Sequence, residues 1–404
     1  MVKNKVIKKV IIISLIIIFI IVIVFLINFI RYKNAKINIK YNNLNVEFLS
    51  NVKISDMIKS INGKIIKDRE INTTKLGKQK ITYKYINEDN LKLKQEFTIN
   101  VVDKTPPLVI MKNSYTYKLG SEINFLNKIF CGDNYDSDLT KEIIGDYDAN
   151  KIGKYDLVFK VTDKSGNETK KDFKLNIVDE LPIYNYPNKT NNVINFADVI
   201  KEYKNENTEI GLDISKWQGD VDFQKIKESG VEFIFIRLGS SKGINKERFI
   251  DNKFERNITE ANKVGIPVGL YFYSYANNEE EAIKDAKFVL KTLKGRKIDL
   301  PIVFDWENWQ FYNEFSLSFY ELSKMAQSFI KTVEKKGYKG MLYSSKNYLE
   351  NVWINLGYPV WLAHYTKKTN YKGDYIYWQM CNNGRINGIN GNVDIDIKLK
   401  RWRS

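Results

Sequence analysis

The pattern of apolar and polar positions divides the chain into segments of four kinds. Residues 10–30 form an uncharged run dominated by Ile, Val, Leu and Phe, long enough to cross about 30 Å of hydrocarbon as a helix. Between that run and about residue 180, two stretches at 77–103 and 153–179 alternate apolar and polar residues, which is the period of half-buried strands. No period holds over residues 181–208, which indicates a linker. From residue 209 onward short apolar runs alternate with helical patterns, which predicts strand–helix units.

The N-terminal apolar run predicts an uncleaved membrane anchor. A cleaved signal peptide would have a shorter apolar region, followed by a cleavage site of small residues. Here the run continues to Ile30 and then Arg31 without such a site. Residues 1–36 are therefore expected to form a short cytoplasmic N-terminus and a single-pass transmembrane helix. That helix would contact the lipid bilayer along residues 10–30, and the long C-terminal part would lie on the extracytoplasmic side.

The alternating segment contains an internal repeat. Residues 77–103 align without gaps on residues 153–179. The repeat predicts two all-β modules, residues 37–104 and 105–180, which resemble the immunoglobulin-like sandwiches of bacterial surface proteins. Neither copy gathers acids or aromatics in one loop, as a ligand or calcium site would. Spacing is therefore the role that we predict for both modules.

Residues 209–404 predict an α/β barrel. Five strand–helix pairs are followed by three strands with little between them, and glycines stand just past the predicted helix ends. Such a series can close into an eight-stranded barrel of the (β/α)5β3 type. The whole chain is accordingly expected to be multidomain, with a transmembrane helix, two β sandwiches and this C-terminal barrel. In such barrels the chemistry gathers at the C-terminal ends of the strands.

Carboxylates follow several of the predicted strand ends. The apolar run before residue 305 ends in Asp305 and Glu307, which project from one face of a strand because alternate residues point the same way. Two carboxylates this close cannot both ionise freely, so the pair can supply an acid and a base near neutral pH. Asp213 ends the first predicted strand, and Asp394 with Asp396 stands near the last.

Aromatic residues are predicted to crowd the same rim. Carboxylates ringed by aromatic side chains suit a carbohydrate, because the apolar ring faces stack while the acids act on the glycosidic oxygen. Three aromatic residues, Phe272, Tyr273 and Phe304, are expected to belong to the core instead. The aromatic residues near the predicted strand ends, with Tyr273 among them as the one expected in the core, are Trp217, Tyr271, Tyr273, Tyr275, Trp306, Trp309, Tyr343, Trp361 and Trp378.

Seven motifs follow one another along residues 209–399: GLDISKWQG at 211–219, GVEFIFIR at 230–237, GLYFYSYA at 269–276, DWE at 305–307, WLAHY at 361–365, WQ at 378–379 and GINGNVD at 388–394. In this order they resemble those of glycoside hydrolase family 25, the lysozymes of the cellosyl type. The chain departs from that pattern at Ser240, where some relatives carry an aromatic residue, and at Asp396, where an Asn is usual.

The resemblance implies a barrel that cleaves the β-1,4 bond between N-acetylmuramic acid and N-acetylglucosamine in peptidoglycan. It implies that Glu307 is the general acid with the raised pKa, and that Asp305 stays ionised and assists. Asp213 and Asp394 would complete the acidic rim. No cofactor and no metal are implied. The implied sugar contacts are Tyr271, Tyr275, Trp217, Tyr343, Trp361 and Gln379.

Charge and cysteine content narrow the remaining choices. Half of the formal net charge of +16 lies in the first 40 residues, and the rest is interspersed with acids, so no nucleic-acid partner is predicted. Two cysteines, Cys131 and Cys381, fall in separate predicted domains and cannot make a disulfide framework. Two alternatives to a muramidase stay open: a wall-binding module that lost turnover, and a glycosidase acting on another acetamido-glycan.

Overall fold

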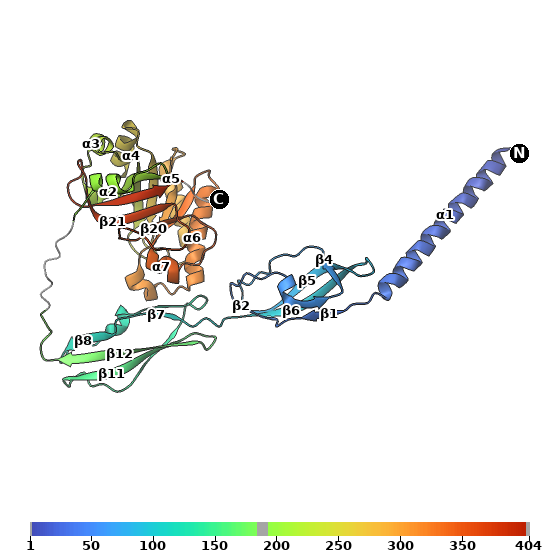
Figure 1. The fold of residues 1–404 in the computed structure, drawn as a ribbon, viewed down its shortest axis with the longest axis horizontal. Helices are drawn as coiled ribbons and strands as arrows, with labels where there is room; N and C mark the ends of the chain where they lie inside the picture. The colour runs from blue at the N-terminus through green and yellow to red at the C-terminus, as the bar shows by residue number, and fades with distance from the viewer. Residues whose placement is uncertain (1, 184–192, 401–404) are drawn as a thin grey trace. The chain divides into compact units, whose positions relative to one another are not determined.

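The computed structural model describes residues 2–183 and 193–400, with side chains from residue 7 onward (Figure 1). The chain forms two compact units, Met1–Lys104 and Thr105–Ser404. The boundary after residue 104 is the one that the repeat predicted. The second boundary, expected between residues 105–180 and the C-terminal barrel, does not separate compact units, because the second β module packs against the barrel.

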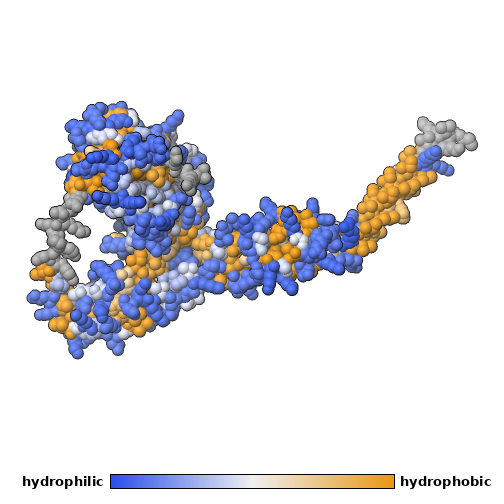
Figure 2. All heavy atoms as spheres, in the orientation of Figure 1, coloured by the Kyte–Doolittle hydropathy of each residue, from blue (hydrophilic) through white to orange (hydrophobic). Residues whose placement is uncertain are grey.

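The first unit begins with a long apolar helix, α1 (Val2–Lys33). Its side chains from Ile7 onward are exposed, and Figure 2 shows apolar residues along the helix. The part Ile7–Lys33 is long and apolar enough to cross a membrane, a property that a signal sequence near an N-terminus shares. Length and composition therefore admit both an anchor and a signal sequence.

The first β module follows α1 in the same unit. A four-stranded sheet has the order β2-β6-β5-β4, and β1 pairs with β3. Alternate residues of β5 and β6, such as Tyr83, Tyr85 and Ile99, are buried, as the alternating pattern predicted. The elements are β1 (Ile39–Tyr41), β2 (Asn45–Glu47), η1 (Ser55–Met57), β3 (Ile58–Ile61), β4 (Gly63–Ile65), β5 (Gly77–Asn87) and β6 (Lys92–Val102).

The second β module opens the second unit and repeats the central hairpin. Its β11 and β12 pair antiparallel, as β5 and β6 do, within a sheet of order β10-β11-β12-β8. A separate antiparallel pair joins β7 to β9. The elements are β7 (Leu108–Ile110), β8 (Ser114–Lys118), η2 (Phe125–Lys128), β9 (Phe130–Gly132), β10 (Thr140–Ile144), β11 (Gly153–Thr162) and β12 (Glu168–Val178).

The expected linker over residues 181–208 is partly wrong. Residues 184–192 of it lie outside the described residues, but β13 (Ile194–Asn195) and α2 (Phe196–Tyr203) follow them. Phe196 and Val199 are buried in the apolar core of the barrel. The helix α2 is short and amphipathic, and the polar residues on both sides of it obscure the helical spacing of its apolar positions. This segment belongs to the barrel and not to a linker.

The barrel is a closed ring of strands. Neighbouring strands run parallel from β14 through β15, β17, β18, β19 and β20 to β21. The last strand, β22, pairs antiparallel with both β14 and β21 and closes the ring. The strands are β14 (Thr208–Ile214), β15 (Phe233–Ser241), β17 (Val268–Tyr273), β18 (Ile302–Asp305), β19 (Gly340–Ser345), β20 (Val360–Ala363), β21 (Tyr377–Arg385) and β22 (Val393–Leu399).

Helices cover the outside of this ring. Apolar side chains form one core between ring and helices and a second core inside the ring. On β15, for example, Ile234 belongs to the outer core and Phe235 to the inner one, since alternate residues face opposite sides. The remaining elements are η3 (Lys216–Gln218), α3 (Phe223–Glu228), β16 (Arg248–Ile250), α4 (Phe254–Lys263), α5 (Glu279–Leu293), η4 (Trp309–Glu314), α6 (Phe319–Glu334) and α7 (Lys346–Asn351).

Candidate active site

A cleft of about 290 Å³ opens where the parallel strands of the ring end. It gathers nine of the ten residues that the sequence pointed to, together with six others. Those that the sequence pointed to are Asp213, Asp305, Glu307, Asp394, Trp217, Tyr271, Tyr343, Trp361 and Gln379. The six others are Ser215, Gln218, Arg237, Tyr273, Tyr365 and Asn382.

The tyrosines of β17 and the loop after it differ from the expectation. Tyr275 does not line the cleft; its ring packs 5.4 Å from that of Tyr273 and against the outer core. Tyr273 lines the cleft instead of joining the core, whereas Phe272 and Phe304 are buried as expected. The reason is that β17 ends at Tyr273, so the alternation that placed three tyrosines on one face stops there.

The segment after β18 holds the two central carboxylates at different depths. Asp305 is the last residue of the strand and is 4% exposed, whereas Glu307 is exposed at the cleft. Between them, the buried Trp306 donates from Nε1 to the carbonyl oxygen of Ala276 at 3.0 Å. Asn308 likewise donates from Nδ2 to the carbonyl of Ser274 at 3.0 Å. These two bonds fix the backbone on both sides of Glu307.

Loss of bulk water around the carboxyl groups raises the pKa of both Asp305 and Glu307, although part of the Glu307 side chain stays exposed at the cleft. For Asp305 the causes are burial first, then the charges of Glu307 and Asp213, with Arg237 acting in the opposite direction. For Glu307 burial raises the pKa, while a hydrogen bond with Asp305 lowers it. The pKa of Asp305 is therefore raised as well, a direction that does not favour the ionised form expected for it. Because the two carboxylates interact, their titrations are coupled.

Asp305 keeps one oxygen atom without a protein partner. Its Oδ1 is buried and accepts no hydrogen bond from any of the residues that the structure describes. Buried polar atoms are nearly always paired, because leaving one unpaired costs about 1–3 kcal/mol. An unpaired acceptor at the floor of a cleft is therefore suited to a ligand.

A second carboxylate group lies where β14 meets β22. Asp213 stands opposite Asp394 in the antiparallel register, and Asp396 follows two residues later on the same strand. Burial and the charge of Asp213 raise the pKa of Asp394 to about 9. Burial, with the charge of Asp396, also raises the pKa of Asp213. The raised pKa of Asp394 therefore favours its protonated form at neutral pH.

Gln379 connects this group to the aromatic wall. Its Nε2 donates to Oδ2 of Asp213 at 2.8 Å. Its Oε1 accepts from the hydroxyl groups of Tyr343 at 2.8 Å and Tyr365 at 3.1 Å. Because Gln379 is 4% exposed, these bonds form in a low-dielectric environment and fix three cleft side chains together.

Among the described residues that line the cleft, Arg237 is the one with a basic side chain. Its Nε donates to Oδ2 of the buried Asp251 at 2.7 Å, and its NH2 nitrogen lies 2.6 Å from the same oxygen. Oδ2 of Asp251 also accepts from the backbone N–H of Lys216 at 3.1 Å, next to Trp217. The ion pair therefore joins β15 to the loop that carries Trp217. No single-sequence signal distinguished this arginine from a surface one.

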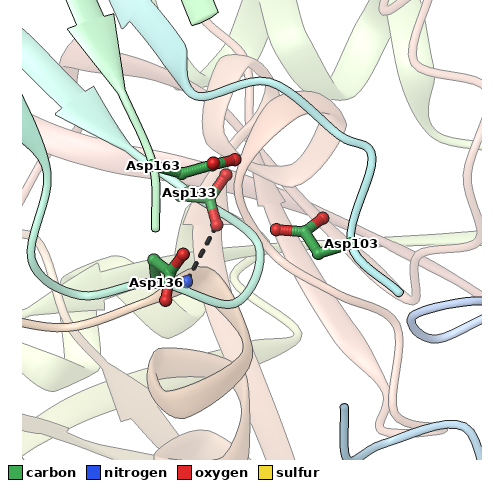
Figure 3. A group of neighbouring side chains, drawn as sticks. All are labelled: Asp103, Asp133, Asp136 and Asp163. Atoms are coloured by element: carbon green, nitrogen blue, oxygen red, sulfur yellow. Dashed lines mark hydrogen bonds between the residues drawn. The ribbon is translucent and has the colours of Figure 1, made fainter. Parts of the chain in front are cut away.

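Groups that could hold a metal ion gather away from the cleft. Asp133, Asp136 and Asp163 of the second β module are buried, and each offers a carboxylate oxygen within 4.8 Å of the others (Figure 3). These oxygens accept backbone hydrogen bonds: Oδ1 of Asp133 from the N–H of Asp136 at 2.8 Å, and Oδ2 of Asp136 from that of Lys164 at 2.9 Å. The acids come from two loops, which is why no single loop in the sequence revealed them.

Comparison with known proteins identifies the family. A model described as "Glycosyl hydrolases family 25" matches residues 212–389. The uncharacterized protein YegX of Escherichia coli K12 is 30% identical over 198 residues, which are 46% of this chain and 68% of that protein. The chain belongs to glycosyl hydrolases family 25.

Other similar proteins cover the same region. The autolytic lysozyme of Clostridium acetobutylicum is 28% identical over 192 residues, 46% of this chain and 54% of that protein. The modular autolysin LytC of Streptococcus pneumoniae, solved in complex with a synthetic peptidoglycan ligand, is 26% identical with a TM-score of 0.43. That match covers 59% of this chain and 56% of the LytC chain.

The two departures from the family 25 pattern lie behind the cleft. Ser240 is 5% exposed, does not line the cleft, and donates from Oγ to the carbonyl of Tyr273 at 2.8 Å. Asp396 is fully buried and accepts from Nε1 of Trp361 at 2.8 Å. Both residues hydrogen-bond to residues that line the cleft, Tyr273 and Trp361, and neither replaces a carboxylate of the cleft.

Proposed function

We propose that this family 25 member is a membrane-anchored peptidoglycan hydrolase, a lysozyme that cleaves the β-1,4 bond between N-acetylmuramic acid and N-acetylglucosamine. The observation that carries the proposal is the exposed carboxyl of Glu307 beside the buried Asp305, in a cleft with aromatic walls. Similarity to proteins named autolytic lysozyme and lysozyme M1 supports the same reaction.

Glu307 acts as the general acid. Its raised pKa favours the protonated form of the carboxyl, and its exposure lets that proton reach the glycosidic oxygen. Transfer of the proton leaves negative charge on the pair, which stabilises an oxocarbenium-like centre at the breaking bond. Asp305 assists from below, where its unpaired Oδ1 can accept a hydrogen bond from the substrate.

Aromatic and polar side chains position the sugars. Trp217 is 76% exposed at the cleft and offers its ring face for stacking on a pyranose. Tyr343 and Trp361 are almost fully buried and are held by hydrogen bonds to Gln379 and Asp396. They therefore form a rigid wall rather than adaptable contacts. Asp213 and Asp394, with Tyr271 and Gln379, complete the binding surface.

The remaining parts place the hydrolase at its substrate. In this proposal α1 is a single-pass anchor in the bacterial cell membrane, and the barrel is extracytoplasmic and faces the wall. The two β modules are immunoglobulin-like, and the barrel is of the (β/α)5β3 type. The exposed apolar side chains of α1 support the anchor, because they would otherwise face water.

Replacement of Glu307 tests the reaction. Full-length protein in detergent is incubated with purified peptidoglycan, and released reducing ends are counted. Glu307→Gln keeps the size of the side chain but removes its proton, and we expect the rate to fall by about 10²- to 10⁴-fold. Glu334→Gln, at the exposed end of α6, is the matched control and should keep the wild-type rate.

The same assay separates the two alternatives. A wall-binding module would sediment with peptidoglycan while the wild type releases no reducing ends, and the enzyme proposal would then fail. Mass spectrometry of the fragments identifies the sugar at the new reducing end. N-acetylmuramic acid is the expected sugar, and N-acetylglucosamine there would indicate a different glycosidase.

A further inference from the structure

The second β module contacts the barrel through one aromatic side chain at its centre. Phe130 of β9 is 9% exposed and belongs to the outer core of the barrel. Its ring centroid lies 4.8 Å from that of Tyr312 and 6.3 Å from that of Phe319, to which it is nearly parallel. It also lies 6.3 Å from Trp309 and 5.9 Å from Tyr348. A residue of one module thus fills a pocket made by η4, α6 and α7.

Directional bonds surround this ring. Asn313 of η4 donates from Nδ2 to the carbonyl of Ile129 at 2.9 Å. The first two N–H groups of α6 donate to the module: Phe319 to the carbonyl of Asp133 at 2.7 Å, and Tyr320 to that of Asn134 at 3.1 Å. The first turn of a helix has N–H groups without intrahelical partners, so the module loop satisfies two of them.

The contact is closely packed at Gly132. A Cβ atom at this position would lie 2.4 Å from the ring atom Cε1 of Phe319 and 2.9 Å from Cε1 of Tyr312. Both are rigid ring atoms rather than the ends of flexible side chains. The module therefore fits the barrel only with glycine at this position, which is typical of a fixed interface.

The contacted segment continues directly into the catalytic pair. Trp309, whose ring contacts that of Phe130, is the second residue after Glu307. Its ring packs edge-to-face on that of Trp306, with the ring centroids 4.9 Å apart. Trp309 also stacks on Tyr348, with ring centroids 3.7 Å apart and an interplanar angle of 11°. Glu307 thus lies in the chain between Trp306 and Trp309, and Trp309 contacts Phe130 of the docked module.

We infer that the second β module is a fixed part of the hydrolase, and that Phe130 is a positioning residue for Glu307 acting through Trp309. This inference rests on the proposed function and deepens it, because it assigns the module a role in turnover instead of spacing. Residues 105–404, and not the barrel alone, then form the working enzyme. Misplacing a catalytic group by about 1 Å can cost about 10²-fold in rate.

The test uses full-length protein in detergent and purified peptidoglycan. Phe130→Ala removes the ring, and Gly132→Ala pushes the module off the rings of Phe319 and Tyr312. For both we expect kcat to fall by about ten- to a hundredfold, with KM changed less than twofold because the sugar-binding walls are untouched. Phe130→Leu keeps an apolar side chain and should recover most of kcat. Leu126→Ala, at an exposed position of the same module, is the matched control.

Hydrogen exchange of the amides of residues 309–314 gives a second readout. Faster exchange there in Phe130→Ala and Gly132→Ala, but not in Leu126→Ala, supports the inference. It is overturned if both variants keep wild-type kcat per folded molecule, even where their unfolding midpoint falls. If the wild type itself releases no reducing ends, the proposed function fails. The docking of the module on the barrel is then tested by the exchange rates alone.

Discussion

The cluster of Asp213 and Asp394 gives the barrel a specific dependence of stability on pH. Asp394 has a pKa of about 9 in the folded protein, through burial and the charge of Asp213. An aspartate in an unfolded chain has a pKa of about 3.9. The folded state therefore binds this proton more tightly than the unfolded state. The resulting stabilisation is fully present below about pH 4 and is lost as the pH rises toward the folded value.

The size of this effect follows from the linkage between protonation and folding. Between the two pKa values, one such group lowers the free energy of unfolding by about 1.4 kcal/mol for each pH unit. From pH 5 to pH 8 the loss amounts to about 4 kcal/mol at most. Asp213 stands opposite Asp394 and competes for the same proton, so this figure is an upper bound.

Asp394→Asn removes the titrating group while keeping its shape. Urea unfolding of the full-length protein in detergent is followed by tryptophan fluorescence at pH 5, 6, 7 and 8. All seven tryptophans lie at residue 217 or later in the sequence, so the signal comes from the C-terminal part of the chain and not from the β modules. We expect the variant to gain stability relative to the wild type as the pH rises, by up to about 4 kcal/mol between pH 5 and pH 8.

The exposed Asp374, outside the cleft, provides the control. Asp374→Asn should leave the pH dependence of the wild type unchanged. The reasoning is refuted if the curves for the wild type and Asp394→Asn run parallel across this range, since Asp394 would then bind its proton equally in the folded and unfolded states.

Two further substitutions distinguish a residue that stabilises the cleft, Gln379, from one that contacts the substrate, Trp217. Gln379→Leu leaves Asp213 and the hydroxyl of Tyr343 without their partner in a buried site, so the free energy of unfolding should fall by about 2–4 kcal/mol in the tryptophan-detected urea assay. Trp217→Ala removes an exposed ring, so stability should change by less than about 0.5 kcal/mol. For Trp217→Ala, KM for peptidoglycan should rise about tenfold. An unchanged KM would mean that Trp217 does not contact the substrate.

The sequence predicted the strands and most cleft residues because their signals are local. Asp305 ends an apolar run, and the pairing of β17 and β19 beside β18 then brings Tyr273 and Tyr343 next to it. The buried position of Arg237 depends instead on Asp251, 14 residues away, and on the fold between them. Tyr275 was misplaced because alternation cannot indicate where a strand ends.

The role of the second module could not be read from its pattern. Phe130 stands between Ile129 and Cys131, which are both buried in the module's own core, so the apolar run does not mark Phe130 as the residue that faces the barrel. The rings that it meets lie about 180 to 220 residues further along the chain. The cluster of Asp133 and Asp163 is hidden for the same reason, since its members belong to separate loops. Short-range periodicity reports which face of a strand is buried, but not what covers that face.

The contacts of the docked module can offset the loss of stability that the buried carboxylates of the cleft cause. Charges of like sign held together in a buried cleft lower the stability of the barrel at neutral pH, as the raised pKa values of Asp213, Asp305 and Asp394 require. A positioned acid nevertheless needs a rigid surround, because turnover depends on where Glu307 stands. Apolar contacts made outside the cleft add stability without altering its charge. Phe130 makes such contacts at the segment that follows Glu307, where rigidity is needed most.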